Sequence, residues 1–256
     1  MKILSLNAWG GQIFEPLIRF VAMQRESGAD LFCFQEIFST SADAREFAFS
    51  PSVLARANLY QELQAVLPGF AGHYSPSVVN AHGVAGVDYG LATFVRPGFD
   101  HTLRSDFIYG KELDETGVTQ PEKGPHPRNM QSLNFADGVT VCNLHGVHAR
   151  DGKGDIPERL EQSEAVNRVV AEIGGEAVIL GDLNLSPDTQ SLAILESGRR
   201  NLIKDFGIAS TRSSYYKKEN RFADYAIVSP GVKVVSFEVL PDEVSDHLPL
   251  LLEITF

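Results

Sequence analysis

Two polar side chains of this sequence could hold a reactive water molecule. Asp182 and Asn184 follow the apolar run VILG and stand two positions apart. Residues at i and i+2 of an extended segment point to the same side of the chain. A carboxylate and an amide placed in this way offer a water molecule both acceptors and a donor. The pair is therefore a candidate for orienting a water for attack.

Other polar residues share this context, because each ends or adjoins an apolar, strand-like run. Singly, each has an ordinary structural explanation, since Asn and Asp commonly cap turns and a lone histidine is usually structural. Together, polar groups at strand ends indicate a site built on a rigid scaffold. The runs that carry them are ILSLN with Asn7, LFCFQE with Glu36, VCNLH with His145, FADYAIV with Asp224 and VSDH with Asp246 and His247.

The residue types favour a hard divalent cation. Asn7, Glu36 and Asp246 supply oxygen ligands, which Mg²⁺ prefers and typically takes from one or two carboxylates. Asp224 and His247 could form a carboxylate–imidazole pair, which fixes the ring tautomer. A zinc site of cysteines and histidines is not expected. Both cysteines stand inside apolar strand-like runs, LFCFQ and VTVCNLH, so we expect them to be buried free thiols.

The elements that must position these residues can be predicted from periodicity. Apolar residues at helical spacing predict helices at about 14–21 and 59–67 and a long one at about 155–173. We expect the long helix to begin with a capping box of Asp155 and Glu158 and to end at Gly174-Gly175. A short helix should follow Ser186-Pro187. Strands are expected at 2–8, 31–35, 70–76, 89–96, 101–109, 129–135, 138–145, 177–181, 224–229, 232–240 and 248–255.

The strands and helices alternate in a way that predicts an α/β (α+β) layered sandwich, one domain over 1–256. Long polar connections are expected at 37–52, 76–88, 110–128, 146–155 and 205–223, and loops of this length are often functional. No apolar run is long enough to cross a membrane, so no stable membrane association is expected. We expect a cytoplasmic monomer.

The charge is unevenly distributed along the chain. The net charge of the 256 residues is −11, which argues against a general grip on nucleic acid. The segment 199–221 nevertheless contains seven arginines and lysines and only two acids. Such a patch suits a phosphorylated ligand bound at one place, DNA or RNA included, with Tyr215 and Tyr216 available for base stacking. A solvated surface loop explains the charge equally well.

The ordered motifs NAWG, FQE, NLHGVH, LGDLN, ADY and SDH span the chain from Asn7 to His247. In this order they closely resemble the endonuclease/exonuclease/phosphatase superfamily, whose members include pancreatic-type deoxyribonucleases, inositol-polyphosphate phosphatases and neutral sphingomyelinases. The resemblance implies a DNase I-like fold, a four-layer sandwich of two packed mixed β-sheets flanked by helices. It also implies hydrolysis of a phosphoester with Mg²⁺ or Mn²⁺.

The resemblance also implies a role for each matching residue. Asn7 and Glu36 would bind the metal with help from Asp246. Asp182 would orient or deprotonate the attacking water, and Asn184 would steady that water and a phosphate oxygen. Asp224 would orient His247 against the scissile phosphate, and His145 would contact the phosphate or assist the leaving group.

Some positions do not match the family pattern. Many members read Arg-x-Asp-Tyr, whereas here Arg221 stands one place earlier, in RFADY. A phosphate-binding Arg or Tyr from the middle of the chain is also not fixed by a motif. Arg128 is our candidate for it, Tyr89 is a second, and Trp9 could line the pocket.

The sequence leaves the substrate open. A nuclease or small-molecule phosphodiesterase is our first prediction, and a lipid or inositol-phosphate phosphatase of the sphingomyelinase kind is the alternative. An inactive phosphate-binding relative would lack a key ligand, yet every expected position is filled. A metal-free hydrolase using Ser245, Asp246 and His247 is disfavoured, because sequence neighbours cannot easily act as nucleophile, base and orienter.

Overall fold

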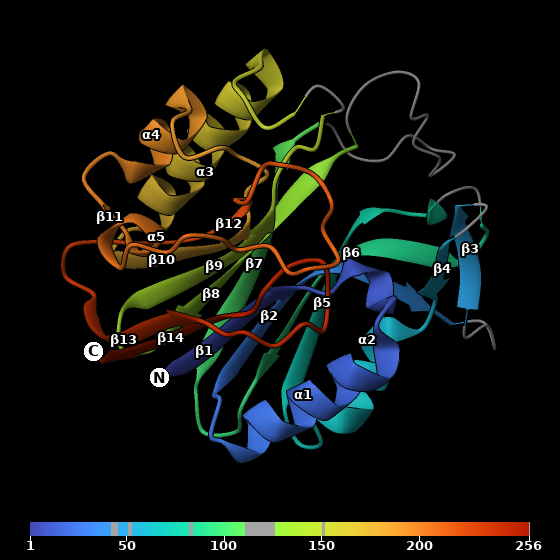
Figure 1. The fold of residues 1–256 in the computed structure, drawn as a ribbon. Coiled ribbons are helices and arrows are strands. Elements are labelled where there is room, and N and C mark those ends of the chain that lie inside the picture. The colour runs from blue at the N-terminus through green and yellow to red at the C-terminus, as the bar shows by residue number, and fades with distance from the viewer. Residues whose placement is uncertain (42–45, 51–52, 82–83, 111–125, 150–151, 256) are drawn as a thin grey trace.

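The computed structural model describes residues 1–256 except 42–45, 51–52, 82–83, 111–125, 150–151 and 256 (Figure 1). The helices are η1 (Trp9–Gly11, a 3-10 helix), α1 (Phe14–Glu26), α2 (Leu59–Val66), α3 (Pro157–Ile173), α4 (Gln190–Glu196) and α5 (Leu202–Asp205). The strands are β1 (Lys2–Asn7), β2 (Leu31–Thr40), β3 (Glu46–Ser50), β4 (Val53–Arg56), β5 (Ala71–Val78), β6 (Val87–Val95), β7 (His101–Tyr109), β8 (Arg128–Phe135), β9 (Val139–His145), β10 (Glu176–Asp182), β11 (Arg200–Asn201), β12 (Asp224–Val228), β13 (Lys233–Val239) and β14 (Leu250–Thr255).

Two six-stranded sheets pack together, and helices cover their outer faces (Figure 1). The first sheet has the order β13-β14-β1-β2-β6-β5, and the second has the order β11-β12-β10-β9-β8-β7. Strands β3 and β4 form a separate hairpin. Both sheets are mixed, which confirms the predicted α/β sandwich of packed mixed sheets with flanking helices.

Each sheet contains one parallel pair, β1 with β2 in the first sheet and β9 with β10 in the second. Parallel neighbours require a crossover, and a helix supplies it in both cases. Helix α1 connects β1 to β2 and buries Leu17, Phe20 and Val21 against the first sheet. Helix α3 connects β9 to β10 and packs Val166 and Val169 on the second sheet. In each βαβ unit the two parallel strands therefore have their carboxyl ends at the same edge of the sheet.

A polar seam crosses the otherwise apolar space between the sheets. The buried Gln35 of β2 donates from Nε2 to Asn143 Oδ1 of β9 at 2.7 Å. Asn143 in turn donates to Phe34 O at 3.2 Å and to Gln131 Oε1 at 3.3 Å. Buried amides need partners, so this chain of hydrogen bonds fixes the lateral position of one sheet on the other.

Several local expectations were wrong. Strand β2 does not end before Glu36 but continues to Thr40, and β3 and β4 occupy part of the expected loop at 37–52. The capping box is also absent, because α3 begins after Ile156 with Pro157 in its first turn. Asp155 caps α4 instead, accepting backbone N–H groups of Gln190 and Ser191 at 2.7 and 2.8 Å.

Other expectations concern the second half of the chain. The helix expected after Ser186-Pro187 is α4, capped by Thr189, and α3 ends at Gly174 as expected. Helix α5 and strand β11 were not predicted. Most of the expected connection at 110–128 lies outside the described residues. No helix in the described part of the chain is long and apolar enough to cross a membrane.

Candidate active site

Three predicted site residues lie side by side in the second sheet. Asp182 ends β10, and the strand register pairs it with His145 of β9 on one side and Asp224 of β12 on the other. The first sheet contributes Asn7, which ends β1, and Glu36 of β2. The site thus includes the carboxyl-terminal residues of β1, β9 and β10, as the strand-end pattern predicted, whereas Glu36 lies inside β2, which continues to Thr40.

Asn7 joins the two halves of the site. Its side chain is fully buried, and its Nδ2 donates to Glu36 Oε1 at 3.1 Å and to Asp182 Oδ2 at 3.0 Å. Its Oδ1 accepts the backbone N–H of Trp9 at 2.9 Å. A carbonyl oxygen has a second lone pair, so Oδ1 can still accept another partner.

The backbone is strained at three residues of this region. Trp9, Glu36 and Asn184 have φ values of 50°, 57° and 53°, in the left-handed region that non-glycine residues rarely adopt. Glu36 lies where the pairing of β2 with β6 shifts register between Phe34 and Ile37. Such bulges re-aim a side chain and occur beside active sites. Strain of this kind persists where the surrounding structure holds a functional geometry.

Asp182 is the most connected carboxylate of the site. Its Oδ1 accepts the backbone N–H of Asn184 at 2.9 Å. Its Oδ2 lies 3.5 Å from His247 Nε2 and 3.6 Å from His145 Nε2. Burial alone would raise the pKa of Asp182, but His247, Lys153 and other cations lower it well below its usual range. The carboxylate is therefore ionised at neutral pH.

His247 forms the predicted pair with Asp224. Its Nδ1 lies 2.9 and 2.8 Å from the two Asp224 oxygens, and both residues are buried. Burial disfavours the imidazolium, but the Asp224 charge outweighs it and raises the pKa of His247. Arg212 opposes this, since its Nη1 contacts His247 Nε2. The ring is held with the Nδ1 proton toward Asp224.

His145 is held between polar neighbours. Tyr89 Oη lies 3.2 Å from its Nδ1, and Asn184 Nδ2 lies 3.2 Å from its Nε2. Burial and the nearby Arg128 lower the pKa of His145 well below its usual value, so the ring is neutral at pH 7. The buried Arg128 also bonds the Tyr89 hydroxyl, which places both predicted substrate contacts beside His145.

The donors in this region fit a hard cation. Glu36, His145 and Asp182 each offer an atom within 4.8 Å of the others, and so do Asp182, Asp224 and His247. The predicted ligand Asp246 belongs to neither group. Its Oδ1 is nevertheless buried without a hydrogen-bond partner in the described part of the chain, 3.6 Å from His247 Nε2. An unpaired buried carboxylate oxygen is a natural cation ligand.

Two buried cations of the site were missed as functional residues. Lys153 and Arg212 are each only 7% exposed, and both act electrostatically on Asp182. Arg212 was visible only as part of the basic segment. Lys153 stands between Gly152 and Gly154 in an expected polar loop, and nothing in that pattern indicates burial. For Lys153, the length of the expected connection at 146–155 was the one feature of the sequence that suggested a functional role.

The mouth of the site is partly aromatic. The Trp9 ring lies 6.5 Å from the ring of Tyr215, which is 42% exposed. Trp9 is partly exposed and its backbone N–H bonds Asn7 Oδ1, so it is not a core residue, and its role as a pocket residue stays a prediction. Tyr216 lies beneath a cation, with its ring centre 4.1 Å from Arg212 Cζ. Only Tyr215 of the two tyrosines is open for stacking.

The basic segment is less available than its composition suggested. Arg200 pairs with Asp205 at 2.9 Å, and Lys204 pairs with Glu196 at 2.8 Å. Arg212 lies inside the site. The other exposed basic residues of the segment are Lys217, Lys218 and Arg221.

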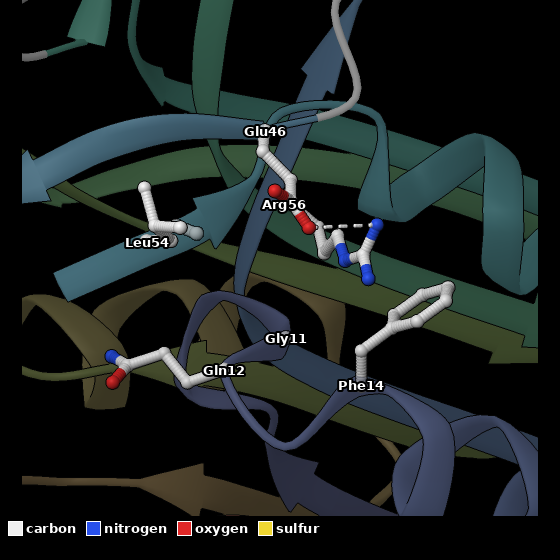
Figure 2. Close-up of a pocket in the computed structure, with 7 residues that line it drawn as sticks. Gly11, Gln12, Phe14, Glu46, Leu54 and Arg56 are labelled. Atoms are coloured by element: carbon white, nitrogen blue, oxygen red, sulfur yellow. Dashed lines mark ion pairs between the residues drawn. The ribbon is translucent and has the colours of Figure 1, made fainter.

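The metal-free alternative has no support in the geometry. Ser245 Oγ accepts the backbone N–H of His247 at 3.2 Å instead of bonding to its ring. A pocket beside η1, lined by Gly11, Phe14 and Arg56 among others, contains none of the predicted site residues (Figure 2). There Arg56 pairs with Glu46 at 3.1 Å and covers the Phe14 ring at 3.9 Å. We regard this pocket as structural.

Comparison with known proteins decides the family. The model of the endonuclease/exonuclease/phosphatase family matches residues 4–247. The chain belongs to this family. The match covers every predicted site residue, and the DNase I-like resemblance inferred from the motifs is confirmed. Family members are phosphoesterases that generally depend on a divalent metal.

Solved structures of the family show the same fold at low sequence identity. A mannosyl-6-phosphatase from Bacteroides thetaiotaomicron is 19% identical, with 100% of each chain covered and a TM-score of 0.73. A family member from Bacteroides vulgatus is 16% identical, with 99% of this chain and 98% of that chain covered and a TM-score of 0.70. ANGEL2, a 2′,3′-cyclic phosphatase, is 13% identical, with 99% and 94% covered and a TM-score of 0.68. A search of the curated proteins finds no significant match.

Proposed function

We propose that this chain is a Mg²⁺- or Mn²⁺-dependent hydrolase that cleaves phosphoesters by in-line attack of an activated water. The observation that carries the proposal is the convergence of Asn7, Glu36, Asp182 and His247 at one place. The cation would neutralise the phosphate charge and stabilise the leaving oxygen. It would be held by Asn7 and Glu36, with Asp246 assisting.

The chain's own residues would organise the attack. Asp182, ionised and fixed by the Asn184 N–H at 2.9 Å, would accept a hydrogen bond from the water. Asn184 Nδ2 bonds His145 Nε2 and Gly146 O, each at 3.2 Å, so it would donate to a phosphate oxygen by exchanging one of these bonds. His247 is oriented by Asp224 at 2.8 Å and has a raised pKa, so as the imidazolium it would donate from Nε2 to the scissile phosphate in place of the present contact with Arg212. Preorganised donors of this kind supply most of the rate enhancement in phosphoryl transfer.

His145 would act beside the leaving group. Tyr89 and Asn184 orient its ring, and Arg128 lies close enough to bond the Tyr89 hydroxyl. The cluster keeps the imidazole neutral, so it can either donate to a phosphate oxygen or assist the departing oxygen. The single-domain assignment of 1–256, the cytoplasmic location, the monomeric state and nucleic-acid binding stay predictions of the sequence.

Removal of metal and of one carboxylate tests the proposal. We expect EDTA to abolish hydrolysis of p-nitrophenyl phosphate and bis-p-nitrophenyl phosphate, and Mg²⁺ or Mn²⁺ to restore it. Asp182→Asn should lower kcat at least ~10²-fold, as the loss of a catalytic group does. The matched control is Asp188→Asn, the same change at an exposed carboxylate six positions along, which should leave kcat unchanged.

Two outcomes would contradict the proposal. Hydrolysis rates that are unchanged by EDTA would contradict the proposed metal dependence. Near wild-type turnover of a folded Asp182→Asn variant would remove the assigned role of this carboxylate. Thermal unfolding of both variants, followed by circular dichroism, separates these outcomes from loss of the fold.

A further inference from the structure

Lys153 is a buried cation that the proposed chemistry does not use. The residue is only 7% exposed, and its Nζ has no hydrogen-bond partner among the described residues. A buried ammonium without a partner is costly. The charges of Asp182, Asp224 and Asp246 favour it, but burial and Arg212 lower the pKa of Lys153 from 10.5 to about 8.

The loop around Lys153 is built to hold this position. Arg159, which is 1% exposed, donates from Nε to Val147 O at 3.1 Å and from Nη2 to Gly152 O at 2.7 Å, and its Nη1 bonds Gly154 O. The Lys153 carbonyl accepts the backbone N–H of Ser186 at 2.9 Å. The buried lysine is therefore anchored on both sides.

Arg212 is a second buried cation with unused capacity. Its Nη1 donates to Asp246 Oδ2 at 2.9 Å and contacts His247, but its buried Nε has no hydrogen-bond partner in the described chain. Its guanidinium covers the Tyr216 ring at 4.1 Å, and Lys153 Nζ lies 5.9 Å from the same ring centre. Lys153 and Arg212, each with a hydrogen-bond donor that lacks a partner among the described residues, thus both lie near the ring of Tyr216.

An anion bound between these two cations would satisfy both. The cations repel each other, and each has a donor that no described residue accepts. Charge-assisted hydrogen bonds to phosphate are short and strong, and an arginine fork suits phosphate oxygens. The flexible stem of lysine allows Nζ to move toward such a ligand.

We propose that Lys153 and Arg212 bind a terminal oxygen of the substrate phosphate, so that the enzyme prefers phosphomonoesters to phosphodiesters. This inference rests on the proposed function. A monoester phosphate has three terminal oxygens and close to two negative charges at pH 7, whereas a diester has two such oxygens and one charge. Lys153 and Arg212 would bind the third terminal oxygen of a monoester. In a diester an uncharged ester oxygen stands in its place, so the two cations would lose this negatively charged partner.

The reaction then releases inorganic phosphate. The water oxygen forms a bond to phosphorus while the bond from phosphorus to the alcohol oxygen breaks. One proton of the water ends on the alcohol oxygen and the other remains on the phosphate. The products are an alcohol and inorganic phosphate, and the phosphate should itself bind to Lys153 and Arg212 as a product inhibitor.

Substitution of Lys153 by a neutral residue of similar length tests this inference. We measure kcat/KM for p-nitrophenyl phosphate and bis-p-nitrophenyl phosphate with wild type, Lys153→Met and Lys153→Arg. The wild type should prefer the monoester. Lys153→Met should lower kcat/KM for the monoester about 10- to 100-fold, the value of one charged hydrogen bond, and for the diester less than ~3-fold. Lys153→Arg, which keeps the charge, should retain most of the preference.

The matched control is Lys204→Met, which removes one exposed lysine of the basic segment that pairs with Glu196 at 2.8 Å. It should change neither substrate's kcat/KM. Binding of inorganic phosphate, measured by calorimetry in the presence of Mg²⁺, should weaken at least ~10-fold in Lys153→Met and stay unchanged in Lys204→Met.

The outcomes separate the two proposals. Equal loss on both substrates in a folded Lys153→Met variant, or a wild type that prefers the diester, would overturn the phosphomonoester inference. If wild type hydrolyses neither ester, the proposed function fails. The phosphate-binding measurement then still decides whether Lys153 and Arg212 form an anion site, because unchanged binding in Lys153→Met would overturn it.

Discussion

At the residue scale, the site depends on side chains that each lie against two other site residues. Asp224 uses both oxygens on His247 Nδ1, at 2.9 and 2.8 Å, and it lies next to Asp182 in the sheet register. It therefore fixes the imidazole proton on Nδ1 and leaves Nε2 to face the site. A histidine held in this way presents one defined atom to a ligand.

Replacement of Asp224 by Asn should disrupt that arrangement. An amide presents no negative charge to His247, so we expect the pKa of the ring to fall and kcat to fall about 10²-fold. The pKa is measured by NMR titration of His247 and kcat with the better of the two nitrophenyl esters. Asp137→Asn, at an exposed turn between β8 and β9, is the matched control. A kcat within ~3-fold of wild type, with a lowered His247 pKa, would show that the pair is not needed.

Residue type and position were sufficient to predict part of the site. Asn7, Asp182 and His247 lie at or beside strand ends, where the backbone itself fixes the side-chain direction. Lys153 and Arg212 could not be predicted in the same way. Their burial depends on Tyr216 and on the brace from Arg159, which are contacts between distant parts of the chain.

At the element scale, α3 supports the loop that follows β9 as well as covering a sheet. Gln162 Oε1 of α3 accepts the backbone N–H of Val147 at 2.6 Å, and Arg159 bonds three carbonyls of the same loop. Asp155, just before α3, caps α4. Helices α3 and α4 and the loop that precedes α3 are thus coupled through side chains at one end of α3.

Loss of the Arg159 guanidinium should loosen this loop. Arg159→Met leaves buried carbonyls without donors, so we expect the free energy of unfolding to fall by at least about 2 kcal/mol. Urea unfolding measures it. Arg104→Met, which removes an exposed arginine paired with Asp106 and Glu172, should cost less than about 1 kcal/mol. Similar losses for both variants would contradict the special role of Arg159.

The elements differ in how far periodicity predicts them. Long apolar runs such as β10 and amphipathic helices such as α1 were expected, because burial of one face leaves a regular pattern. The bulge at Glu36 was not, since it interrupts β2 without Gly or Pro to mark it. The capping box failed because the Asp155 side chain found backbone donors on α4 in place of its own helix.

At the scale of the whole molecule, histidines are held neutral in polar contacts at two places. Burial, together with Arg128, lowers the pKa of His145 from 6.5. On the far edge of the sheets, His73 Nε2 lies 2.7 Å from His101 Nε2, and burial plus the His101 charge lowers the pKa of His73 from 6.5. Both rings bind protons less readily in the folded chain than in the unfolded one.

Stability should therefore depend on pH near the ordinary histidine pKa. The contribution of His145 and His73 is complete above about pH 6.5 and is lost as pH falls below it, because the unfolded chain then binds more protons. His247, whose pKa is raised, contributes in the opposite direction. His73→Gln removes one of the lowered pKa values, so the loss of unfolding free energy between pH 7.5 and pH 5.0, measured in urea, should be smaller in this variant than in wild type, by about 1.4 kcal/mol for each unit of pKa lowering. The same loss in both proteins would contradict this reasoning.

The seam of Gln35, Asn143 and Gln131 has a consequence for how this protein would fail. The proposed site takes Asn7 and Glu36 from the first sheet and Asp182 from the second, so a small slide of one sheet over the other would separate Asn7 from Asp182 while the apolar cores stayed buried. Activity should therefore respond to a small misalignment of the two sheets more strongly than the melting temperature does. A damaged or mutated protein would lose its activity before it unfolded.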